Sequence, residues 1–259
     1  MVFKAMMRSI RELFLFLLLG IFSKAISMKP PHSRSSSDSQ ESFSYCLSWR
    51  LAVEANNVRA WRTVPTQCLR YIETYMTGGQ YDRDVELIAE QILLYATEIT
   101  VSDDGLDAWI LDVDDTCISN ILYYREKRYG CDPYDSSGFK AWALTGGCPA
   151  IPAMLVLFNK LVESGFKIIL VTGRDEATFG EVTRDNLRDQ GFIGYDRLIM
   201  RSESDRGKSA VAYKSEIRKQ LMEEDYRIWG NVGDQWSDLQ GECVGNRTFK
   251  IPNPMYFVP

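Results

Sequence analysis

Carboxylates follow two apolar runs of this sequence, at positions where they could do chemistry together. The runs cover residues 108–111 and 226–232. Short apolar runs are typical of buried parallel strands, and ligands bind at the carboxyl ends of such strands. The sequence therefore predicts a carboxylate cluster at one edge of a sheet. Its members are Asp112, Asp114, Asp234 and Asp238.

Hydroxyl, backbone and ammonium groups complete the set. Thr172 and Gly173 follow the apolar run 167–171, and Thr116 closes the pattern Asp-x-Asp-x-Thr. Lys214 lies in a helical stretch that precedes the last acidic strand end. These residue types can hold the oxygens of a phosphoryl group. We therefore expect Thr116, Thr172, Gly173 and Lys214 to bind substrate.

This combination indicates phosphoryl transfer. Clustered carboxylates repel one another unless a cation neutralises them, and Mg²⁺ is the usual cation in an all-oxygen site. One carboxylate, Asp112, can then attack phosphorus and form an acyl phosphate. A second, Asp114, can protonate the leaving oxygen and later activate water, and we assign to Asp114 the proton that one acid of such a pair keeps. The predicted substrates are small phosphomonoesters.

Each piece has a plain structural alternative. Residues 112–116 could be a solvated turn, residues 172–174 a turn after a strand, and Lys214 a surface lysine. The Gly-Asp pair at 233–234 with a second acid at 238 is more specific. Their order along the chain, each after an apolar run or on the helix before one, makes coincidence a poor explanation.

A single histidine, His32, limits the other hydrolytic mechanisms. It lies in a Ser-rich stretch, far in sequence from the acidic motifs. Ser–His–Asp hydrolysis, Cys–His proteolysis and histidine-nucleophile phosphatases all need a histidine in the site. Carboxylates, hydroxyls, lysines and a hard metal ion therefore remain as the chemical groups.

Alternating strand and helix patterns predict an α/β fold, a parallel sheet with helices on both faces. The strand-like runs are residues 108–111, 167–171, 197–200, 226–232 and 248–251. Helical stretches at 152–163, 176–190 and 208–223 separate them. Residues 45–99 are predicted to form an N-terminal helical extension, in which Pro65 opens a second helix.

Residues 117–149 interrupt this alternation. They are rich in aromatic and turn residues, and they are longer than a simple crossover between two strands needs. We interpret them as a small cap insertion that covers the site, and the aromatic rings of this segment as determinants of substrate choice.

The N-terminus resembles a secretory signal peptide. Basic residues precede a ten-residue apolar run at 13–22, and small residues follow up to Ala25. The run is shorter than the roughly 20 residues of a membrane span. We therefore expect a signal peptide at 1–25, a disordered N-terminus at 26–44, and no membrane attachment after cleavage; an uncleaved anchor is the alternative. The net charge of −5 argues against nucleic-acid binding.

Six cysteines fit the same export route, since disulfides form in oxidising compartments. Two pairings are short enough in sequence to suggest themselves, Cys46 with Cys68 and Cys131 with Cys148, but six cysteines allow 15 pairings. Asn246 begins the sequon Asn-Arg-Thr, so glycosylation is expected there if the segment is exposed.

The motifs resemble those of the haloacid dehalogenase superfamily of phosphatases: Asp-x-Asp-x-Thr, Ser/Thr, Lys, then Gly-Asp-x-x-x-Asp. Further segments look like the plant acid phosphatase and vegetative storage protein branch, a class B-type acid phosphatase family. These are residues 49–56, 65–68, 75–81, 213–216 and 230–239. The similarity covers the chain from about Tyr45 to its end, so that 45–259 is expected to be one phosphatase domain.

The resemblance implies a Rossmann-like core with a small cap, Mg²⁺ dependence and hydrolysis at acidic pH. Asp112 matches the nucleophile, and Asp114 matches the acid/base. Mg²⁺ would take the Asp112 carboxylate, the Asp114 backbone carbonyl and Asp234, with Asp238 in support. Lys214 fits the lysine motif better than the nearby Lys208.

The branch also includes storage proteins, some of which lack the nucleophile. This chain keeps Asp112, which favours an active enzyme, with a storage protein of weak or vestigial activity as the alternative. The resemblance further implies secretion or delivery to the vacuole, and it is compatible with a homodimer.

Overall fold

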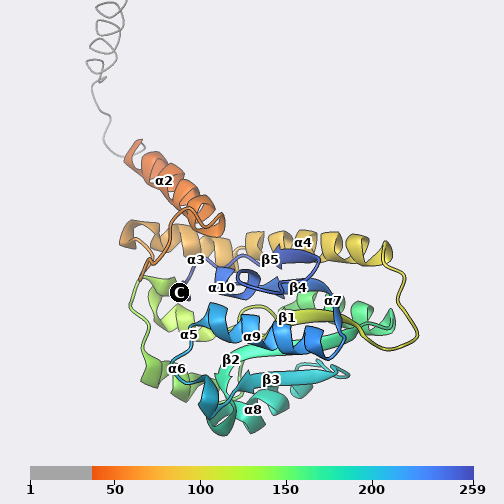
Figure 1. Ribbon diagram of the computed structural model, residues 1–259. Helices are drawn as coiled ribbons and strands as arrows, with labels where there is room; N and C mark the ends of the chain where they lie inside the picture. The colour runs from red at the N-terminus through yellow and green to blue at the C-terminus, as the bar shows by residue number, and fades with distance from the viewer. Residues whose placement is uncertain (1–36) are drawn as a thin grey trace, which may run out of the picture. The chain divides into compact units, whose positions relative to one another are not determined.

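Five parallel strands form the central sheet of the computed structural model, which describes residues 37–259 (Figure 1). The strands are β1 Asp107–Asp112, β2 Lys167–Asp175, β3 Arg197–Arg201, β4 Arg227–Gly233 and β5 Arg247–Lys250. Their order in the sheet is β3-β2-β1-β4-β5. The first strand of the chain, β1, thus lies at the centre of the sheet. All five predicted strands and their parallel arrangement are confirmed.

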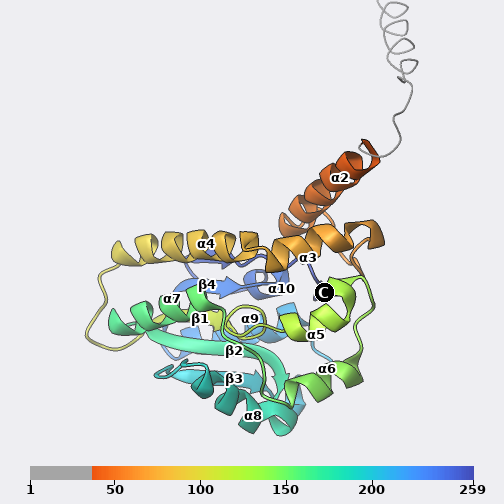
Figure 2. The same ribbon diagram turned by 180° about the vertical axis from the view of Figure 1, so that it is seen from behind.

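Helices cover both faces of this sheet, as the alternating pattern predicted (Figures 1 and 2). On one face, Ala108 and Ile110 of β1 pack against α9 Ala210–Glu223. On the other, Trp109 and Leu111 face a larger core shared with α4 Gln80–Thr97, α7 Pro152–Glu163 and α8 Glu176–Asp189. Because successive side chains of a strand point to opposite faces, an all-apolar run was the expected sequence for a strand buried on both sides.

The N-terminal extension is helical, but it begins earlier than predicted. The helices are α2 Ser37–Glu54, the short 3-10 helix η1 Thr66–Cys68, α3 Leu69–Thr77 and then α4. The expectation of disorder through residue 44 is therefore wrong for 37–44. That stretch is Ser-rich and has little apolar periodicity, so its sequence gave no helix signal. The rest of the expected disordered segment, residues 26–36, and the signal peptide expected at 1–25 lie outside the described residues.

Of the two suggested disulfides, the structure contains one. Cys46 of α2 is bonded to Cys68 at the end of η1. Cys131 and Cys148 are free, so the second suggestion is wrong. The Cys148 thiol is instead buried in a polar network, where its sulfur lies 3.6 Å from the Arg174 guanidinium.

We expect this disulfide to contribute measurably to stability. It closes a loop with a sequence separation of 22, and a cross-link of that span stabilises a fold by about 3 kcal/mol, mainly by restricting the unfolded chain. A Cys46→Ala/Cys68→Ala variant should therefore melt well below the parent in a thermal scan. Cys243→Ala, which removes a free, partly exposed thiol, is the control; equal melting temperatures for all three proteins would contradict the expectation.

The insertion between β1 and α7 lies beside the carboxyl ends of the strands (Figure 1). It contains α5 Ile121–Glu126, the 3-10 helix η2 Arg128–Gly130 and α6 Ser136–Ala143. Tyr123 and Tyr124 of α5 are buried, and Phe139 of α6 packs edge-on against Tyr123. Several of the aromatic residues that set this segment apart in the sequence thus pack on one another and join the larger core of the sheet.

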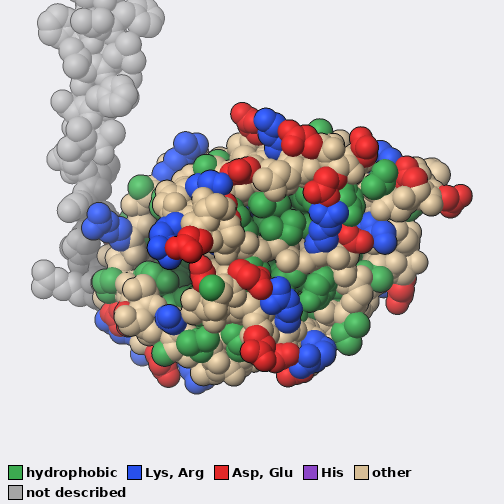
Figure 3. Space-filling model, turned by 60° about the horizontal axis from the view of Figure 1, so that its bottom comes forward, with side chains coloured by type: hydrophobic (Ala, Val, Ile, Leu, Met, Phe, Trp, Pro, Cys, Tyr) green, Lys and Arg blue, Asp and Glu red, His purple; other side chains and the backbone are tan. Residues whose placement is uncertain are grey.

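The structure closes with α10 Trp236–Leu239, which follows β4, and an irregular segment after β5. Among the described residues, no helix has the length and apolar character needed to span a membrane. On the face shown in Figure 3, Lys and Arg side chains are interspersed with Asp and Glu. That face therefore carries no continuous basic area.

Candidate active site

The register of the sheet explains why the predicted site residues meet. Asp112 at the end of β1 pairs with Val171 of β2, so Thr172 comes one position later on the neighbouring strand. On the other side, Leu111 pairs with Val232 of β4, which places Asp234 just beyond that strand. Three chain segments distant in sequence thus end at one edge, with β1 in the middle.

The Lys214 ammonium bridges the carboxylates of Asp112 and Asp238. It lies on α9 and is only 6% exposed. Its Nζ donates to Oδ1 of Asp112 and, at 2.7 Å, to Oδ1 of Asp238. A buried ammonium between two carboxylates is strongly held, because its removal would leave two buried negative charges without a cation. The geometry therefore fixes Lys214 beside Asp112, as predicted.

Asp234 is oriented by two amides. Gln235 Nε2 and Asn253 Nδ2 donate to its Oδ2 at 2.7 and 2.6 Å. Its Oδ1 receives no hydrogen bond from the described residues, and neither does Oδ2 of Asp112. Both oxygens of Asp238 are engaged, since Oδ1 accepts from Lys214 and Oδ2 accepts from the backbone N–H of Gln235 at 2.9 Å. Asp112 and Asp234 thus keep an oxygen for a ligand, while Asp238 supports Lys214.

A glycine lets the last two elements of this site approach closely. A Cβ added at Gly233 would lie 2.4 Å from the Cβ of Asp238. Such a separation is sterically excluded, so a side chain at position 233 would push Asp238 out of contact with Lys214. The glycine of the Gly-Asp motif is therefore needed for packing.

The charge balance of the cluster suits a bound cation. Carboxylate oxygens of Asp112, Asp234 and Asp238 all lie within 4.8 Å of one another, and all three residues are buried. Burial, together with the charges of Asp238 and Asp112, raises the pKa of Asp234 well above its ordinary value. Burial likewise raises the pKa of Asp112, although Lys214 opposes the shift. A divalent metal ion would relieve this excess negative charge, and oxygen-only donors are those that a hard cation prefers.

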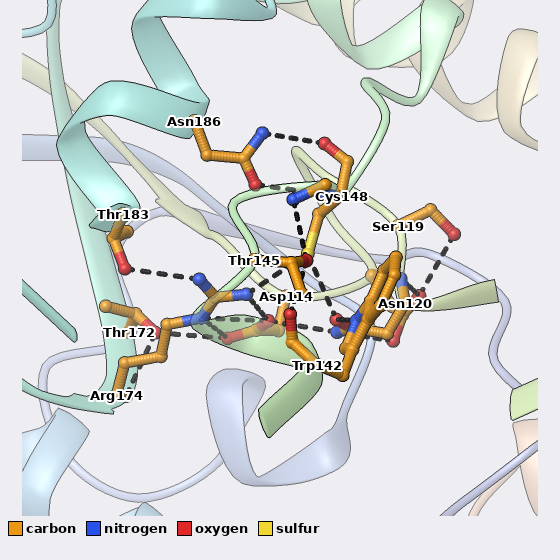
Figure 4. A network of polar contacts seen from close by, with 12 residues as sticks. Asp114, Ser119, Asn120, Trp142, Thr145, Cys148, Thr172, Arg174, Thr183 and Asn186 are labelled. Atoms are coloured by element: carbon orange, nitrogen blue, oxygen red, sulfur yellow. Dashed lines mark hydrogen bonds and ion pairs between the residues drawn. The ribbon is translucent and has the colours of Figure 1, made fainter. Parts of the chain in front are cut away.

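Asp114 lies on the other side of Asp112 and is held by Arg174, which the sequence analysis treated only as a turn residue (Figure 4). The guanidinium donates to Asp114 Oδ1 at 2.7 Å through Nη2 and to Oδ2 at 3.0 Å through Nε. Arg174 is anchored in turn by Thr183 at 3.1 Å and by the Cys148 sulfur. The Thr172 hydroxyl lies 3.3 Å from Asp114 Oδ2. The carboxyl group is therefore fixed in a bidentate ion pair.

This ion pair opposes the expected proton distribution. The sequence pattern placed the proton of the Asp112–Asp114 pair on Asp114. Burial alone would raise the pKa of Asp114, but the ion pair with Arg174 holds that pKa below its ordinary value. The ion pair therefore disfavours protonation of Asp114, which acidic solution would promote.

The remaining predicted residues differ in their position relative to the acidic cluster and the cavity. Gly173 lines the cavity described below, whereas Thr116 is fully buried, does not line it, and has an Oγ1 without a hydrogen-bond partner among the described residues. Lys208 pairs with Asp205 and Glu216 instead of the acidic cluster, which supports the choice of Lys214. Asn246 is exposed next to the edge strand β5.

A cavity of about 700 Å³ opens above the acidic cluster. Asp112, Asp114, Lys214 and Asp234 lie on its wall. Much of the remaining wall is aromatic, with side chains from the insertion, from the segment before η1 and from the end of the chain. These are Trp61, Tyr124, Tyr134, Phe139, Tyr256 and Phe257. The C-terminal segment runs beside α5 (Figure 1), where Tyr256 stacks on Tyr124 at 4.8 Å.

Several residues of the site were missed because their signals are weak in sequence. Arg174 could have been suspected as a cation directly after a strand end that faces acids. Gln235 follows Asp234 immediately, but nothing in its type marks it as a partner. Asn253 and Tyr256 come from an irregular segment, and Asn120 from a turn, so no periodic pattern indicates where they point.

Comparison with known proteins assigns the chain to a family. Residues 32–259 match the family model described as HAD superfamily, subfamily IIIB (acid phosphatase). Acid phosphatase 1 of Solanum lycopersicum is 43% identical over 213 residues, covering 82% of this chain and 83% of the tomato protein. Vegetative storage protein 2 of Arabidopsis thaliana is 36% identical over 219 residues, covering 84% and 82%. A stem 31 kDa glycoprotein of Glycine max is 40% identical, covering 82% and 83%.

A solved structure supports the fold independently. The class C acid phosphatase of Bacillus anthracis superposes with a TM-score of 0.61, covering 74% of this chain and 85% of the bacterial one. The sequence identity is 18%, so this similarity concerns the arrangement of strands and helices alone.

Proposed function

The chain belongs to the acid phosphatase family of HAD superfamily subfamily IIIB, and on that premise we propose that it is a secreted or vacuolar, Mg²⁺-dependent hydrolase of small phosphomonoesters. The observation that carries the proposal is the buried contact of Lys214 with Asp112 at the base of the cavity, beside Asp234. This arrangement offers a carboxylate nucleophile, a fixed cation and a set of oxygen donors at one point.

The roles follow from these positions. Asp112 attacks phosphorus, and the bond from phosphorus to the ester oxygen breaks, which gives an aspartyl phosphate. Lys214 stabilises the phosphoryl oxygens as negative charge shifts between them, with Gly173 on the cavity wall and the Thr172 hydroxyl beside Asp114. In acidic solution, where Asp114 can carry a proton, it gives that proton to the departing oxygen, and its carboxylate later takes one from the water that releases phosphate.

A bound Mg²⁺ would be held by Asp112 and Asp234, with the backbone carbonyl of Asp114, and would neutralise charge on the phosphoryl group. Asp238 contributes indirectly, because it anchors Lys214. The amides of Gln235 and Asn253 fix which oxygen of Asp234 faces the site.

The cavity supports a small substrate. Its volume of about 700 Å³ lies within the range of small-molecule pockets. The aromatic wall would contact the organic part of the ester, while the acidic base receives the phosphate with its cation. The size and the acidic charge both favour small esters over nucleic acid.

The compartment is inferred from separate features. The stretch at 1–25 has the composition of a signal peptide, and the similar soybean protein is named as a stem glycoprotein. Asn246 is exposed, as a sequon must be for glycan attachment. A disulfide joins Cys46 and Cys68, which fits an oxidising compartment.

A storage role is the second candidate, because vegetative storage proteins are among the similar chains. The two functions share a fold, so only turnover separates them. The intact set of Asp112, Asp114, Lys214 and Asp234 favours the enzyme.

Turnover of a chromogenic phosphomonoester at mildly acidic pH, with Mg²⁺ and with EDTA, tests the proposal. We expect hydrolysis with Mg²⁺ and a loss of at least about 100-fold after chelation, because the acidic cluster would then face the phosphate without its cation. A panel of alkyl, aryl, sugar and nucleoside phosphates defines the substrate range. A folded protein without Mg²⁺-dependent turnover on any ester would leave the storage role.

A further inference from the structure

Asn120 lies near the start of the insertion, close to the carboxyl end of β1. It precedes α5, is 1% exposed, and does not line the cavity. Its Nδ2 donates to Asp114 Oδ1 at 2.9 Å, and its Oδ1 accepts from Trp142 Nε1 at 3.0 Å (Figure 4). One side chain thus contacts both the predicted acid and helix α6 of the insertion.

The chemistry of the partners fixes the orientation of this amide. The indole of Trp142 can only donate a hydrogen bond, so the Asn120 oxygen must face Trp142 and the Asn120 NH₂ must face Asp114. A flipped amide would lose both contacts. The Asn120 amide also donates to Asp115 Oδ2 at 3.2 Å, and its oxygen accepts from the Cys148 thiol at 3.5 Å. The side chain is therefore held in one rotamer by four neighbours.

Asp114 therefore accepts hydrogen bonds from two different parts of the protein. Arg174 approaches its Oδ1 at 2.7 Å from the α8 side of the site, and Asn120 approaches the same oxygen from the insertion (Figure 4). Arg174 fixes both oxygens of Asp114 through the bidentate ion pair, and Asn120 adds a further donor to Oδ1 from the insertion. Proton transfer depends on such alignment.

The insertion supplies the other end of the contact. Trp142 lies on α6, the helix that also presents Phe139 to the cavity wall. The position of α6 therefore determines both the shape of the cavity and the support beneath Asn120. These contacts therefore connect α6, which lies beside the organic group of the substrate, with Asp114, which protonates the leaving oxygen.

We propose that Asn120 is a positioning residue, which aligns the Asp114 carboxyl group for proton transfer to the leaving oxygen and which is itself aligned by Trp142 of α6. This inference rests on the proposed phosphatase function. It predicts a defect in protonation, so the damage depends on the leaving group. Esters of basic alcohols need the proton, whereas a nitrophenolate leaves readily without it.

The test compares kcat/KM for p-nitrophenyl phosphate with kcat/KM for a simple alkyl phosphate, because kcat/KM reports the step in which the leaving group departs and not the later release of phosphate. Asn120→Ala should lower kcat/KM about tenfold for the alkyl ester and about twofold or less for the nitrophenyl ester, as expected for the loss of one aligning hydrogen bond. KM should change little, because Asn120 lies outside the cavity wall. Trp142→Phe keeps a ring but removes the donor, and should give a smaller defect of the same kind.

The double variant tests whether the two residues act as one unit. If Trp142 acts through Asn120, Asn120→Ala/Trp142→Phe should be no slower than Asn120→Ala alone. Tyr123→Phe is the matched control, because it removes a different hydrogen bond within the insertion, from its hydroxyl to the Asp135 carbonyl at 3.1 Å. That variant should affect both esters equally or not at all.

The outcomes separate this inference from the function on which it rests. Wild-type protein that hydrolyses neither ester overturns both. Active wild type, with losses in Asn120→Ala and Trp142→Phe that are equal for the two esters, overturns the positioning role only. If Asn120→Ala fails to fold, Trp142→Phe decides: a loss confined to the alkyl ester supports the role, and its absence refutes it.

Discussion

Asp112→Asn should lower kcat for phosphomonoester hydrolysis by at least about 10⁴-fold, because an amide cannot attack phosphorus and form the acyl phosphate. The variant should stay folded, since Lys214 keeps its second partner, Asp238, at 2.7 Å. Steady-state kinetics on a chromogenic ester, together with a thermal scan, measures both effects.

Asp107→Asn is the matched control for that experiment. Asp107 lies at the other end of the same strand, is also buried, and pairs with Arg227 at 2.7 Å. The same chemical change there should lower stability without lowering kcat. A retained rate in Asp112→Asn, or an equal loss of rate in both variants, would contradict the assignment of the nucleophile.

Lys214→Met should weaken both the fold and the catalysis. Without the ammonium, Asp112 and Asp238 become buried carboxylates with no cation between them, which costs about 3 kcal/mol of stability. The loss of a charge beside the phosphoryl oxygens should lower kcat by at least about 100-fold. Urea unfolding and steady-state kinetics measure the two effects, and added Mg²⁺ should restore part of the stability but little of the rate.

Lys208→Met is the control for Lys214. Lys208 is six residues earlier, and its ion pairs are to Asp205 and Glu216 on the partly exposed side of the molecule. This variant should keep its kcat. A lower kcat for Lys208→Met than for Lys214→Met would contradict the assignment of Lys214 to the site.

The fold was largely predictable because its strands are buried on both faces. The run Ala108 to Leu111 is apolar throughout, since one side of β1 meets α9 and the other meets α7 and α4. The same holds for β2, and the turns after each helix are marked by glycines such as Gly165 and Gly191, both with positive φ. The start of α2 was not predicted, because residues 37–44 carry few apolar side chains.

The core of the site was predictable for a geometric reason. Parallel strands that are neighbours end together, so acids after β1 and β4 must meet, and the lysine on the intervening helix α9 comes with them. Side-chain direction does not follow from this rule. The contact of Arg174 with Asp114 depends on Thr183 and Cys148, which lie in two other segments.

The influence of Arg174 on the proton of Asp114 was missed for the same reason. Two acids separated by one residue suggested that one of them keeps a proton, and only the contact with Arg174 shows which state is favoured. The pairing of cysteines was equally open in sequence. Cys148 could be excluded only once its sulfur was found among polar neighbours.

The central claim, covalent catalysis by Asp112, is tested most directly by trapping the intermediate. Enzyme mixed with substrate and Mg²⁺ is quenched with borohydride, which reduces an acyl phosphate to the alcohol and so converts the aspartate into homoserine. Mass spectrometry of the digested protein should find homoserine at position 112, only when substrate is present, and not in Asp112→Asn. Rapid turnover with the modification at another residue, or with no modified residue under conditions that accumulate the intermediate, would contradict the account.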